Sequence, residues 1–487
     1  MKELIEKNNI NKIENIKSEN NKDNVKKSKL GYTKIKDTVI GILLVIWMII
    51  PLLKEIQATT IFIQKYEYSI MEIIAIAGIY IFTYEIYRRI KNAENKKELI
   101  KELLPIILLT AYLIWTLISC IFAQDKQKAF YGTDYRKDGF ITYLVYAGFF
   151  LSAYLIKSNK IKKILLNVFL IVSLLNILII NLTSNNVSLL KMFIYRKVEI
   201  GVFLNSNHYG YYLLLATIIA CILLITEKNK IHPINLLAWA IFLLYNLIYN
   251  NTLGCYIAFT IVLILFLIYS IYSKKYIKIS GIVLLIFITL SCVVQKNDKN
   301  IVISNINSMI KDAKSIINID TNNNKKDIEE NNNTQNNKKD SSNSNTNNKI
   351  SDKELRKIGS GRGELWKYGT IMILEKPLLG YGAENLEEEY AKYNIDQDRP
   401  HNLLIQLATT SGIPGLLLYM SAIVLILIRG IKKLKEHNSE DNSIYLVAYF
   451  AVIAYLISAM FGNSMYYTSP YFFILLGIVT RSLLSRC

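Results

Sequence analysis

Four arginines that could bind phosphate lie in segments between the apolar runs of the sequence. A guanidinium group keeps its charge at any relevant pH, and its fixed fork of donors suits phosphate oxygens. Together these arginines indicate an anionic, phosphate-bearing substrate. The alternative is that each one pairs with lipid headgroups or with a nearby acid, for instance Arg136 with Asp134 or Asp138. The arginines are Arg136, Arg196, Arg362 and Arg399.

Two histidines accompany the arginines. His208 follows Asn205 and Asn207 directly before an apolar run. His401 stands immediately before Asn402, where another apolar run begins. Because the pKa of histidine lies near neutral pH, either imidazole could serve as a general base. Either could instead be a hydrogen-bonded structural residue.

The elements that must position these side chains are membrane-spanning helices. Hydrophobic residues make up 52% of the 487 residues, and the mean hydropathy is +0.27. Uncharged runs such as residues 252–273 have the length of a helix that crosses a bilayer. The pattern predicts an all-α, polytopic membrane protein of about twelve transmembrane helices. The candidate spans are residues 38–53, 68–86, 103–123, 139–156, 164–182, 208–226, 233–250, 252–273, 277–294, 402–429, 444–461 and 470–485.

The charge pattern predicts an orientation. The formal net charge of +19 sits in short clusters between the apolar runs. Cytoplasmic loops of membrane proteins carry an excess of Lys and Arg. Placing the clusters at residues 88–101, 157–163, 227–230, 274–278 and 429–435 on that side puts both termini in the cytoplasm. The arginines and histidines above then lie on the outer face of the cell membrane, and no nucleic-acid partner is expected.

The domain organisation follows from these spans. Residues 1–37 are a basic, polar cytoplasmic tail without an evident cleavable signal. Residues 38–294 hold nine spans, residues 295–401 form a large extracytoplasmic loop, and residues 402–487 hold the last three spans. Within the loop, residues 321–350 are mostly Asn, Lys, Ser and Asp, which predicts a disordered insertion. Residues 359–401 form its catalytic portion, with a surface helix at residues 362–375 that Pro377 and the Gly380-Tyr381-Gly382 turn end.

Metal and transport chemistry are disfavoured. The five cysteines are scattered singly, without metal-ligand spacing, so no metal and no cofactor are expected. The spans are nearly free of charge, with Glu72 and Glu85 both nearer the ends of the second span than its centre. Ion-coupled transporters normally keep charged groups at mid-membrane. A flippase or exporter, and a non-catalytic partner in an assembly, remain as alternatives to an enzyme.

Four stretches of the sequence resemble the bacterial O-antigen ligase and polymerase family. The order of the stretches, the twelve spans and the position of the large loop match together, over about residues 100 to 480. The stretches are Gly132 with Arg136-Lys137-Asp138-Gly139, the segment from Gly201 to His208 with Asn205 and Asn207, Gly361-Arg362 with Trp366 and Pro377 to Gly382, and His401-Asn402 with Ser411-Gly412-Ile413-Pro414-Gly415.

The resemblance implies a fold grouped with the membrane glycosyltransferases of the GT-C type. It implies that an acceptor hydroxyl attacks the anomeric carbon of a sugar carried on polyprenyl pyrophosphate, outside the cytoplasmic membrane. The donor would be a polyprenyl-pyrophosphate-linked oligosaccharide, and the acceptor a glycan in a polymerase, or a lipid, protein or wall polymer in a ligase. Membrane lipids surround the spans, and no nucleotide or obligatory metal is implied.

Carried over to this chain, the resemblance makes His401 the candidate base and Arg362 a pyrophosphate contact, both catalytic. Arg136 is the next candidate for the anionic end of the substrate, while Arg196 and Arg399 rest on position. The remaining substrate-binding candidates are Asn205, Asn207, His208 and Asn402. One departure is clear: many members carry Ser-Arg-Gly at the start of the eighth span, where this chain has Gly254-Cys255 and no arginine.

Overall fold

The computed structural model describes residues 31–184, 203, 205–226, 233–297, 303–304, 307, 362–435, 443–463 and 465–484. Across these residues the secondary structure is helical and contains no strand. The predicted tail up to residue 30, the predicted insertion at 321–350 and Arg196 lie outside the described residues.

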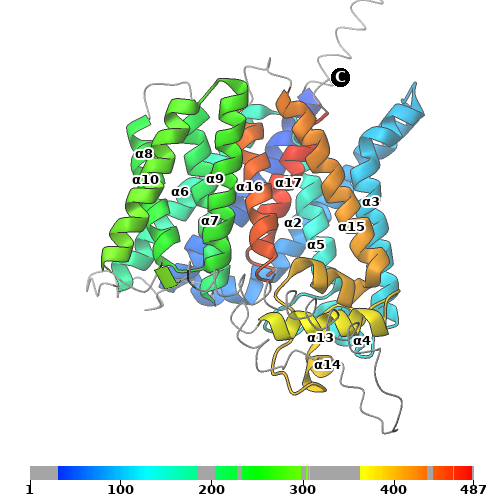
Figure 1. The fold of residues 1–487 in the computed structure, drawn as a ribbon. Coiled ribbons are helices and arrows are strands. Elements are labelled where there is room, and N and C mark those ends of the chain that lie inside the picture. The colour runs from blue at the N-terminus through cyan, green and yellow to red at the C-terminus, as the bar shows by residue number, and fades with distance from the viewer. Residues whose placement is uncertain are drawn as a thin grey trace, which may run out of the picture.

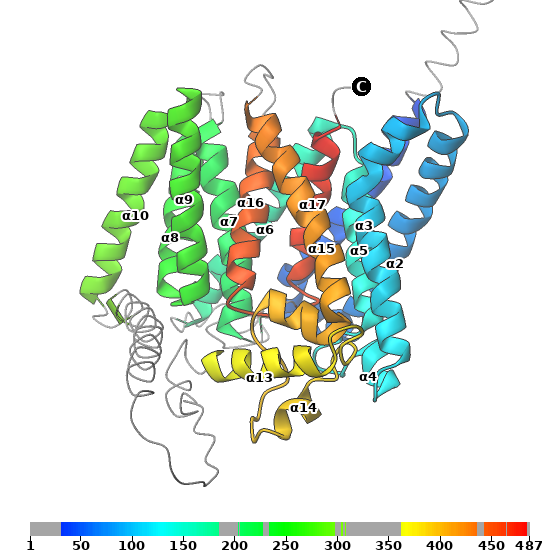
Figure 2. The same cartoon turned by 45° about the vertical axis from the view of Figure 1, so that its right-hand side comes forward.

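The described residues form twelve helices of the bundle, which stand side by side (Figure 1). Turned by 45°, the same helices still run roughly parallel (Figure 2). They are Gly31–Glu55, α2 (Gln57–Lys91), α3 (Lys96–Ile121), α5 (Phe140–Leu155), α6 (Asn159–Ser184), α7 (Ser206–Thr226), α8 (Pro233–Tyr249), α9 (Leu253–Ser273), α10 (Ile277–Asn297), α15 (Leu403–Lys435), α16 (Ser443–Ala459) and α17 (Ser469–Ser482).

Each of the twelve predicted spans falls on one of these helices. Eight helices within the described part of the chain are long and apolar enough to cross a membrane. Three more are apolar but shorter, namely Phe140–Leu155, Ile234–Tyr249 and Ser443–Ala459. The all-helical, polytopic membrane class is therefore confirmed, while the number of twelve crossings stays a prediction.

The first helix begins at Gly31, inside the residues assigned to the polar tail. Two of its polar residues there, Lys36 and Asp37, are buried because they hold the turn between α5 and α6. Asp37 is 1% exposed, and its Oδ2 accepts hydrogen bonds from the backbone N–H groups of Lys157 (2.9 Å) and Ser158 (2.7 Å). Lys36 pairs with Asp37 at 2.9 Å. The sequence shows these residues as hydrophilic, but it does not show what they cap.

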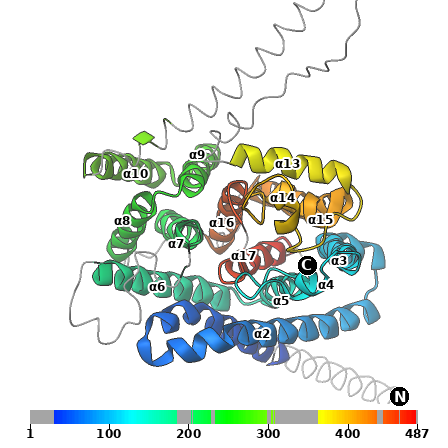
Figure 3. The same ribbon diagram turned by 90° about the horizontal axis from the view of Figure 1, so that it is seen from below.

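The centre of the bundle is formed by α7, α16 and α17, of which nearly every residue is buried. Viewed from below, α16 and α17 lie between α6 to α10 on one side and α2, α3, α5 and α15 on the other (Figure 3). Helices α2 and α5 approach closely at glycines. A Cβ atom on Gly148 would lie 2.4 Å from the Cα of Ala75, and one on Gly78 would lie 2.6 Å from the carbonyl oxygen of Gly148.

Three short helices form a layer across one end of the bundle: α4 (Lys126–Tyr131), α13 (Arg362–Glu375) and α14 (Glu387–Ala391) (Figures 1 and 2). Helix α13 has the bounds predicted from the sequence. The turn predicted after it is present, because Gly380 and Gly382 have φ angles of 66° and 86°, which favour glycine. A Cβ on Gly380 would also lie 2.5 Å from the carbonyl oxygen of Thr409.

This glycine turn packs against a break in α15. Gly412 has φ 70° and ψ 176°, so the helix is interrupted there. The carbonyls of Thr409 and Thr410, which the break releases, accept hydrogen bonds from the N–H groups of Tyr381 and Gly382, both at 2.9 Å. Two stretches that resemble the O-antigen ligase family therefore form one structural unit. It connects to α3 through Trp115, whose Nε1 donates to the carbonyl of Ser411 at 3.0 Å.

We expect Gly148→Ala to destabilise the bundle. The added methyl group would collide with the backbone of α2, and overpacking of this kind costs about 1–3 kcal/mol. Gly281→Ala is the matched control, because no atom lies within 4 Å of a Cβ at that position in α10. Thermal unfolding in detergent should fall for Gly148→Ala and stay level or rise for Gly281→Ala. Equal unfolding temperatures for the two variants would refute this packing.

Candidate active site

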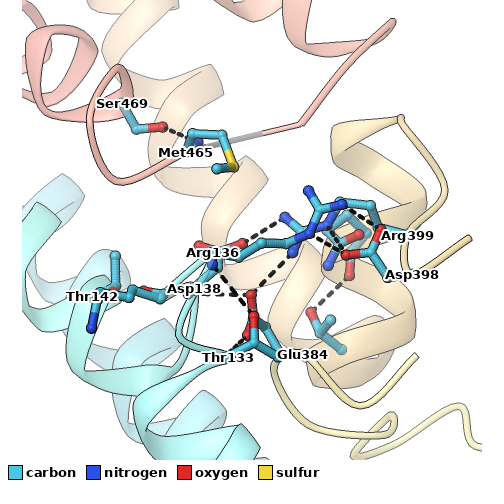
Figure 4. Close-up of polar contacts among 12 residues, drawn as sticks. Thr133, Arg136, Asp138, Thr142, Glu384, Asp398, Arg399, Met465 and Ser469 are labelled. Atoms are coloured by element: carbon cyan, nitrogen blue, oxygen red, sulfur yellow. Dashed lines mark hydrogen bonds and ion pairs between the residues drawn. The ribbon is translucent and has the colours of Figure 1, made fainter. Parts of the chain in front are cut away.

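A buried arginine lies at the centre of the candidate site. Arg399 is 2% exposed and precedes α15 by four residues. Its Nη1 pairs with Asp138 Oδ2 at 3.1 Å, its Nη2 with Glu384 Oε1 at 3.1 Å, and its Nε with Asp398 Oδ2 at 3.3 Å (Figure 4). Every nitrogen of the guanidinium group therefore faces a carboxylate. We refer to Arg399, Asp138, Glu384, Asp398 and Arg136 as the Arg399 cluster.

Glu384 extends the cluster to the loop between α4 and α5. Its carboxylate accepts hydrogen bonds from the backbone N–H groups of Thr133 and Asp138 (Figure 4). Gly132 and Gly139 bring the two ends of this loop into backbone contact, and Gly132 has a φ of 76°. The loop is thus closed on itself and fastened to the segment that precedes α15.

Arg136 belongs to the same cluster through a different acid from those expected. It pairs with Asp398 by its Nε, and its Nη2 donates to Asp398 Oδ1 at 2.9 Å. Asp138, proposed from the sequence as its partner, instead pairs with Arg399. Pairing with acids was the alternative to phosphate binding, and the structure shows it for both arginines.

The Arg399 cluster contains three carboxylates and two guanidinium groups. Burial raises the pKa of Asp138 to about 7, although Arg399 acts in the opposite direction. Asp138 is 3% exposed, and its Oδ1 has no hydrogen-bond partner among the described residues. Burial lowers the pKa of Arg399, but the charges of Asp138, Asp398 and Glu384 outweigh it and raise the pKa overall. Arg399 is therefore permanently charged, and Asp138 is the acid in the cluster that takes up a proton.

His401 lies two residues beyond Arg399 at the start of α15. Its φ of 52° is unusual for a residue other than glycine and marks a strained position. Two neighbours fix it: Asn402 Oδ1 caps α15 by accepting from the N–H of Leu404 at 2.9 Å, and Trp366 Nε1 donates to the carbonyl of Pro400 at 3.0 Å. The imidazole itself has no hydrogen bond to another described residue, and its side chain is partly exposed.

The pKa of His401 is lowered to about 4. Burial is the main cause, followed by the positive charges of Arg362 and Arg399, while Asp398 partly opposes them. The imidazole is therefore neutral at pH 7 and has a lone pair available for a proton.

Arg362 supplies a cation without a carboxylate. It is the first residue of α13, is partly buried, and forms no ion pair with any described residue. Burial lowers its pKa, and Tyr211 of α7 opposes this effect. Since Arg362 also lowers the pKa of His401, the two side chains lie within electrostatic reach of each other.

The start of α7 contributes His208 and two asparagines. His208 is 5% exposed, and its Nδ1 forms a hydrogen bond with the hydroxyl of Tyr467 at 2.7 Å. The hydrogen-bonded structural alternative therefore applies to this histidine. Asn205 Oδ1 accepts from the N–H of Asn207 at 2.7 Å and so holds the helix start.

The structure thus brings together most of the residues proposed from the sequence. Arg136, Arg362, Arg399, His208 and His401 influence one another electrostatically. Asn402 faces α16, since its Nδ2 donates to the carbonyl of Met460 at 3.2 Å. Arg196 lies outside the described residues. Cys255, which stands where many family members have arginine, is fully buried in α9.

Glu384 and Asp398 were missed in the sequence. Both are acids of the large loop, one just after the glycine turn and the other beside Arg399. Their position near the motif residues could have indicated that both acids belong to the site. Nothing in the sequence indicates which arginine each acid pairs with. Among the described residues, no group of three or more His, Cys, Asp or Glu side chains is arranged to hold a metal ion.

An apolar cavity of about 110 Å³ opens beside the Arg399 cluster. Asp138, Arg399 and the unpartnered Oε1 of Gln406 mark its polar part. The remaining wall comes mainly from α3, α5 and α15, including Ile106, Leu109, Leu113, Phe150, Leu151, Leu403 and Leu407.

Comparison with known families finds one match. Residues 236–420 match the family model described as O-antigen ligase. The matched segment includes Arg362, Arg399, His401 and Asn402, and this match confirms the resemblance to the O-antigen ligase and polymerase family. A comparison with curated proteins finds no matching relative.

We expect Arg399→Met to destabilise the protein strongly. Removing the guanidinium group leaves Asp138 and Glu384 buried without a cation, and breaking a buried pair in this way costs about 3–5 kcal/mol. Lys126→Met is the control, since Lys126 is exposed and forms no ion pair with a described residue, so its loss should change stability by less than about 1 kcal/mol. Thermal unfolding in detergent measures both. An Arg399→Met variant as stable as the control would show that the cluster does not hold the site together.

Proposed function

Taking the match to the O-antigen ligase family as the premise, we propose that the chain is a GT-C-type membrane glycosyltransferase that transfers or polymerises glycans from a polyprenyl-pyrophosphate donor. The family supports a membrane glycan ligase or polymerase in general. The donor, the side of the membrane and the residues that act are the proposal.

The proposal places the candidate site on the outer face of the cytoplasmic membrane, with both termini inside. Basic residues support this orientation. Helices α2, α15 and α17 end in Arg88, Arg89, Lys91, Lys432, Lys433, Lys435 and Arg481. These helix ends lie at the end of the bundle opposite to α13 (Figure 1). An excess of Lys and Arg marks the cytoplasmic side of membrane proteins.

One observation carries the catalytic proposal: a neutral imidazole and a cation, neither of which is paired with another described residue, lie within electrostatic reach of each other. His401 supplies the first and Arg362 the second. In a folded protein, partly buried polar groups are usually paired, so two unpaired groups of complementary function indicate a substrate site.

The reaction proceeds by a direct displacement. An imidazole nitrogen of His401 accepts the proton of the acceptor hydroxyl while the hydroxyl oxygen attacks the anomeric carbon of the donor sugar. The bond between that carbon and the pyrophosphate oxygen breaks, and its electron pair leaves with polyprenyl pyrophosphate. Arg362 stabilises the negative charge that develops on the leaving group, and such a fixed donor contributes about 3–4 kcal/mol in the transition state.

Arg399 and Arg136 act in this proposal as positioning residues. Their donors already face Asp138, Glu384 and Asp398, so they hold the loop before His401 in place. Arg196, Asn205, Asn207, His208 and Asn402 stay candidates for contact with the substrate or for shaping the entrance to the site. The apolar cavity beside the cluster suits the first isoprene units of the donor, because its wall is mainly hydrocarbon.

A flippase or exporter of lipid-linked glycans is the alternative. It would need charged groups along a passage through the bundle, whereas the cations discussed here gather at one end. Reconstitution with a lipid-linked oligosaccharide separates the possibilities. A ladder of lengthening products indicates a polymerase, a single transfer indicates a ligase, and translocation without bond formation indicates an exporter.

We expect His401→Ala and Arg362→Ala each to reduce transfer by about 100-fold or more in this reconstituted assay. Loss of a general base costs about 10²–10⁴ in rate, and loss of a donor to the developing charge about 10²–10³. Both variants should unfold at the wild-type temperature, because neither side chain forms a hydrogen bond or ion pair with another described residue. Lys392→Ala is the control with unchanged activity. Wild-type rates in both site variants would remove them from the catalytic mechanism.

The pH profile gives a second test of His401. Because its pKa is lowered to about 4, kcat/KM should stay level as the pH falls from 7 to 5 and decline only near pH 4. Asp138 affects the stability of the fold and not the rate. Because its pKa is raised, its contribution to the free energy of unfolding is fully present below about pH 4 and is lost as the pH rises through about 7. Acidification to pH 5 therefore does not unfold the protein through Asp138. A decline in kcat/KM centred near pH 6.5 would contradict the assignment of His401 as a base with a lowered pKa.

A further inference from the structure

A second, polar cavity lies on the same face as the candidate site. We propose that it binds the acceptor glycan and selects a neutral or amino-sugar chain over an anionic one. This inference rests on the proposed function and adds to it the chemical class of the acceptor. We call this cavity the outer cleft.

The outer cleft is open and has a volume of about 730 Å³. It lies between the loop that precedes α5 and the segment from α14 to Arg399. Its polar side chains include Arg136, Glu387, Asn394, Asp396, Gln397 and Asp398. A space of this size and polarity suits several linked sugar rings rather than a hydrocarbon chain, for which the apolar cavity is better suited.

Three side chains of the outer cleft are available to a ligand. Asn394, Asp396 and Gln397 are exposed, and none forms a hydrogen bond or ion pair with another described residue. Amide and carboxylate groups offer both donors and acceptors, which match the hydroxyl groups of a sugar. The hydrogen-bonding capacity of these three side chains is therefore not used by another described residue.

The charges of the outer cleft determine which glycan fits. Arg136 is neutralised by Asp398, with Nη2 and Oδ1 at 2.9 Å. Asp396 forms no ion pair with a described cation. Glu387 pairs with Lys128 at 3.9 Å, and Lys128 also pairs with Glu388 at 3.5 Å. The cleft is thus net acidic. Like charges disfavour uronic acids or phosphate on the bound chain, whereas uncharged or amino sugars meet no repulsion.

The outer cleft is connected to the proposed base. Asp398 and its partner Arg136 both line the outer cleft. Asp398 also pairs with Arg399, whose Nε lies 3.3 Å from Asp398 Oδ2. His401 follows Arg399 by two residues. A glycan lying in the cleft would therefore end close to the imidazole, with its terminal hydroxyl available for attack on the donor.

The test measures binding without catalysis. Saturation-transfer NMR on the full chain in nanodiscs compares three oligomers of four sugars: chitotetraose (neutral), its fully deacetylated form (cationic) and tetragalacturonate (anionic). We expect the neutral and cationic oligomers to bind and the anionic one not to bind. Asp396→Asn combined with Gln397→Ala should weaken chitotetraose binding about tenfold, because a change of this size corresponds to the loss of one charge-assisted hydrogen bond. Glu387→Lys combined with Asp396→Lys should reverse the preference to tetragalacturonate.

The controls separate this inference from the proposed function. Lys392→Ala, on the same segment, should bind as the wild type does, and so should the inactive His401→Ala. In the transfer assay, Asp396→Asn with Gln397→Ala should raise the acceptor KM about tenfold and leave kcat unchanged. Transfer with an unchanged acceptor KM would overturn the inference and leave the enzyme assignment intact. Binding of the anionic oligomer by the wild type, or of neither other oligomer, would also overturn it.

Discussion

The arrangement of the candidate site depends on one buried guanidinium group. Three carboxylates converge on Arg399: Asp138 from the loop before α5, Glu384 from the segment after α13, and Asp398 from the preceding residue in the chain. A buried charge must be paired, so these segments cannot shift independently without exposing an unbalanced ion. The strained backbone of His401 begins at this fixed point. Because Arg399 and Arg136 donate to the carboxylates of the cluster, their donors are not available to a substrate. The cluster instead fixes the position of His401, the residue proposed to act on the substrate.

Two kinds of space meet at this cluster. The apolar cavity extends from it among α3, α5 and α15, and the outer cleft lies on its other side. Asp138 and Arg399 border the first, and Asp398 borders the second. The proposed lipid-linked donor and hydrophilic acceptor differ in polarity, and a boundary of paired charges would keep each in the environment that suits it. His401, one of the proposed catalytic groups, follows Arg399 of this boundary by two residues in the chain.

Much of the fold could be predicted from the sequence because it depends on local properties. The length of an apolar run determines a membrane helix, and α13 and the turn at Gly380 and Gly382 were likewise predicted from local residue patterns. The partners within the site could not be predicted in this way. Asp138 is two residues from Arg136 in the sequence but pairs with Arg399, because the choice depends on how distant segments pack. The same holds for Lys36 and Asp37, whose burial depends on the turn before α6.

The interruption of α15 at Gly412 has a mechanical consequence. Trp115 on α3 holds the carbonyl of Ser411, and the glycine turn holds those of Thr409 and Thr410. The part of α15 before Gly412, which follows His401, is thus fastened to α3 and to the glycine turn as well as to the rest of its own helix. The height of α3 across the lipid is governed by hydrophobic matching with the bilayer. A change in the thickness of the surrounding membrane would therefore be expected to move the imidazole together with α3.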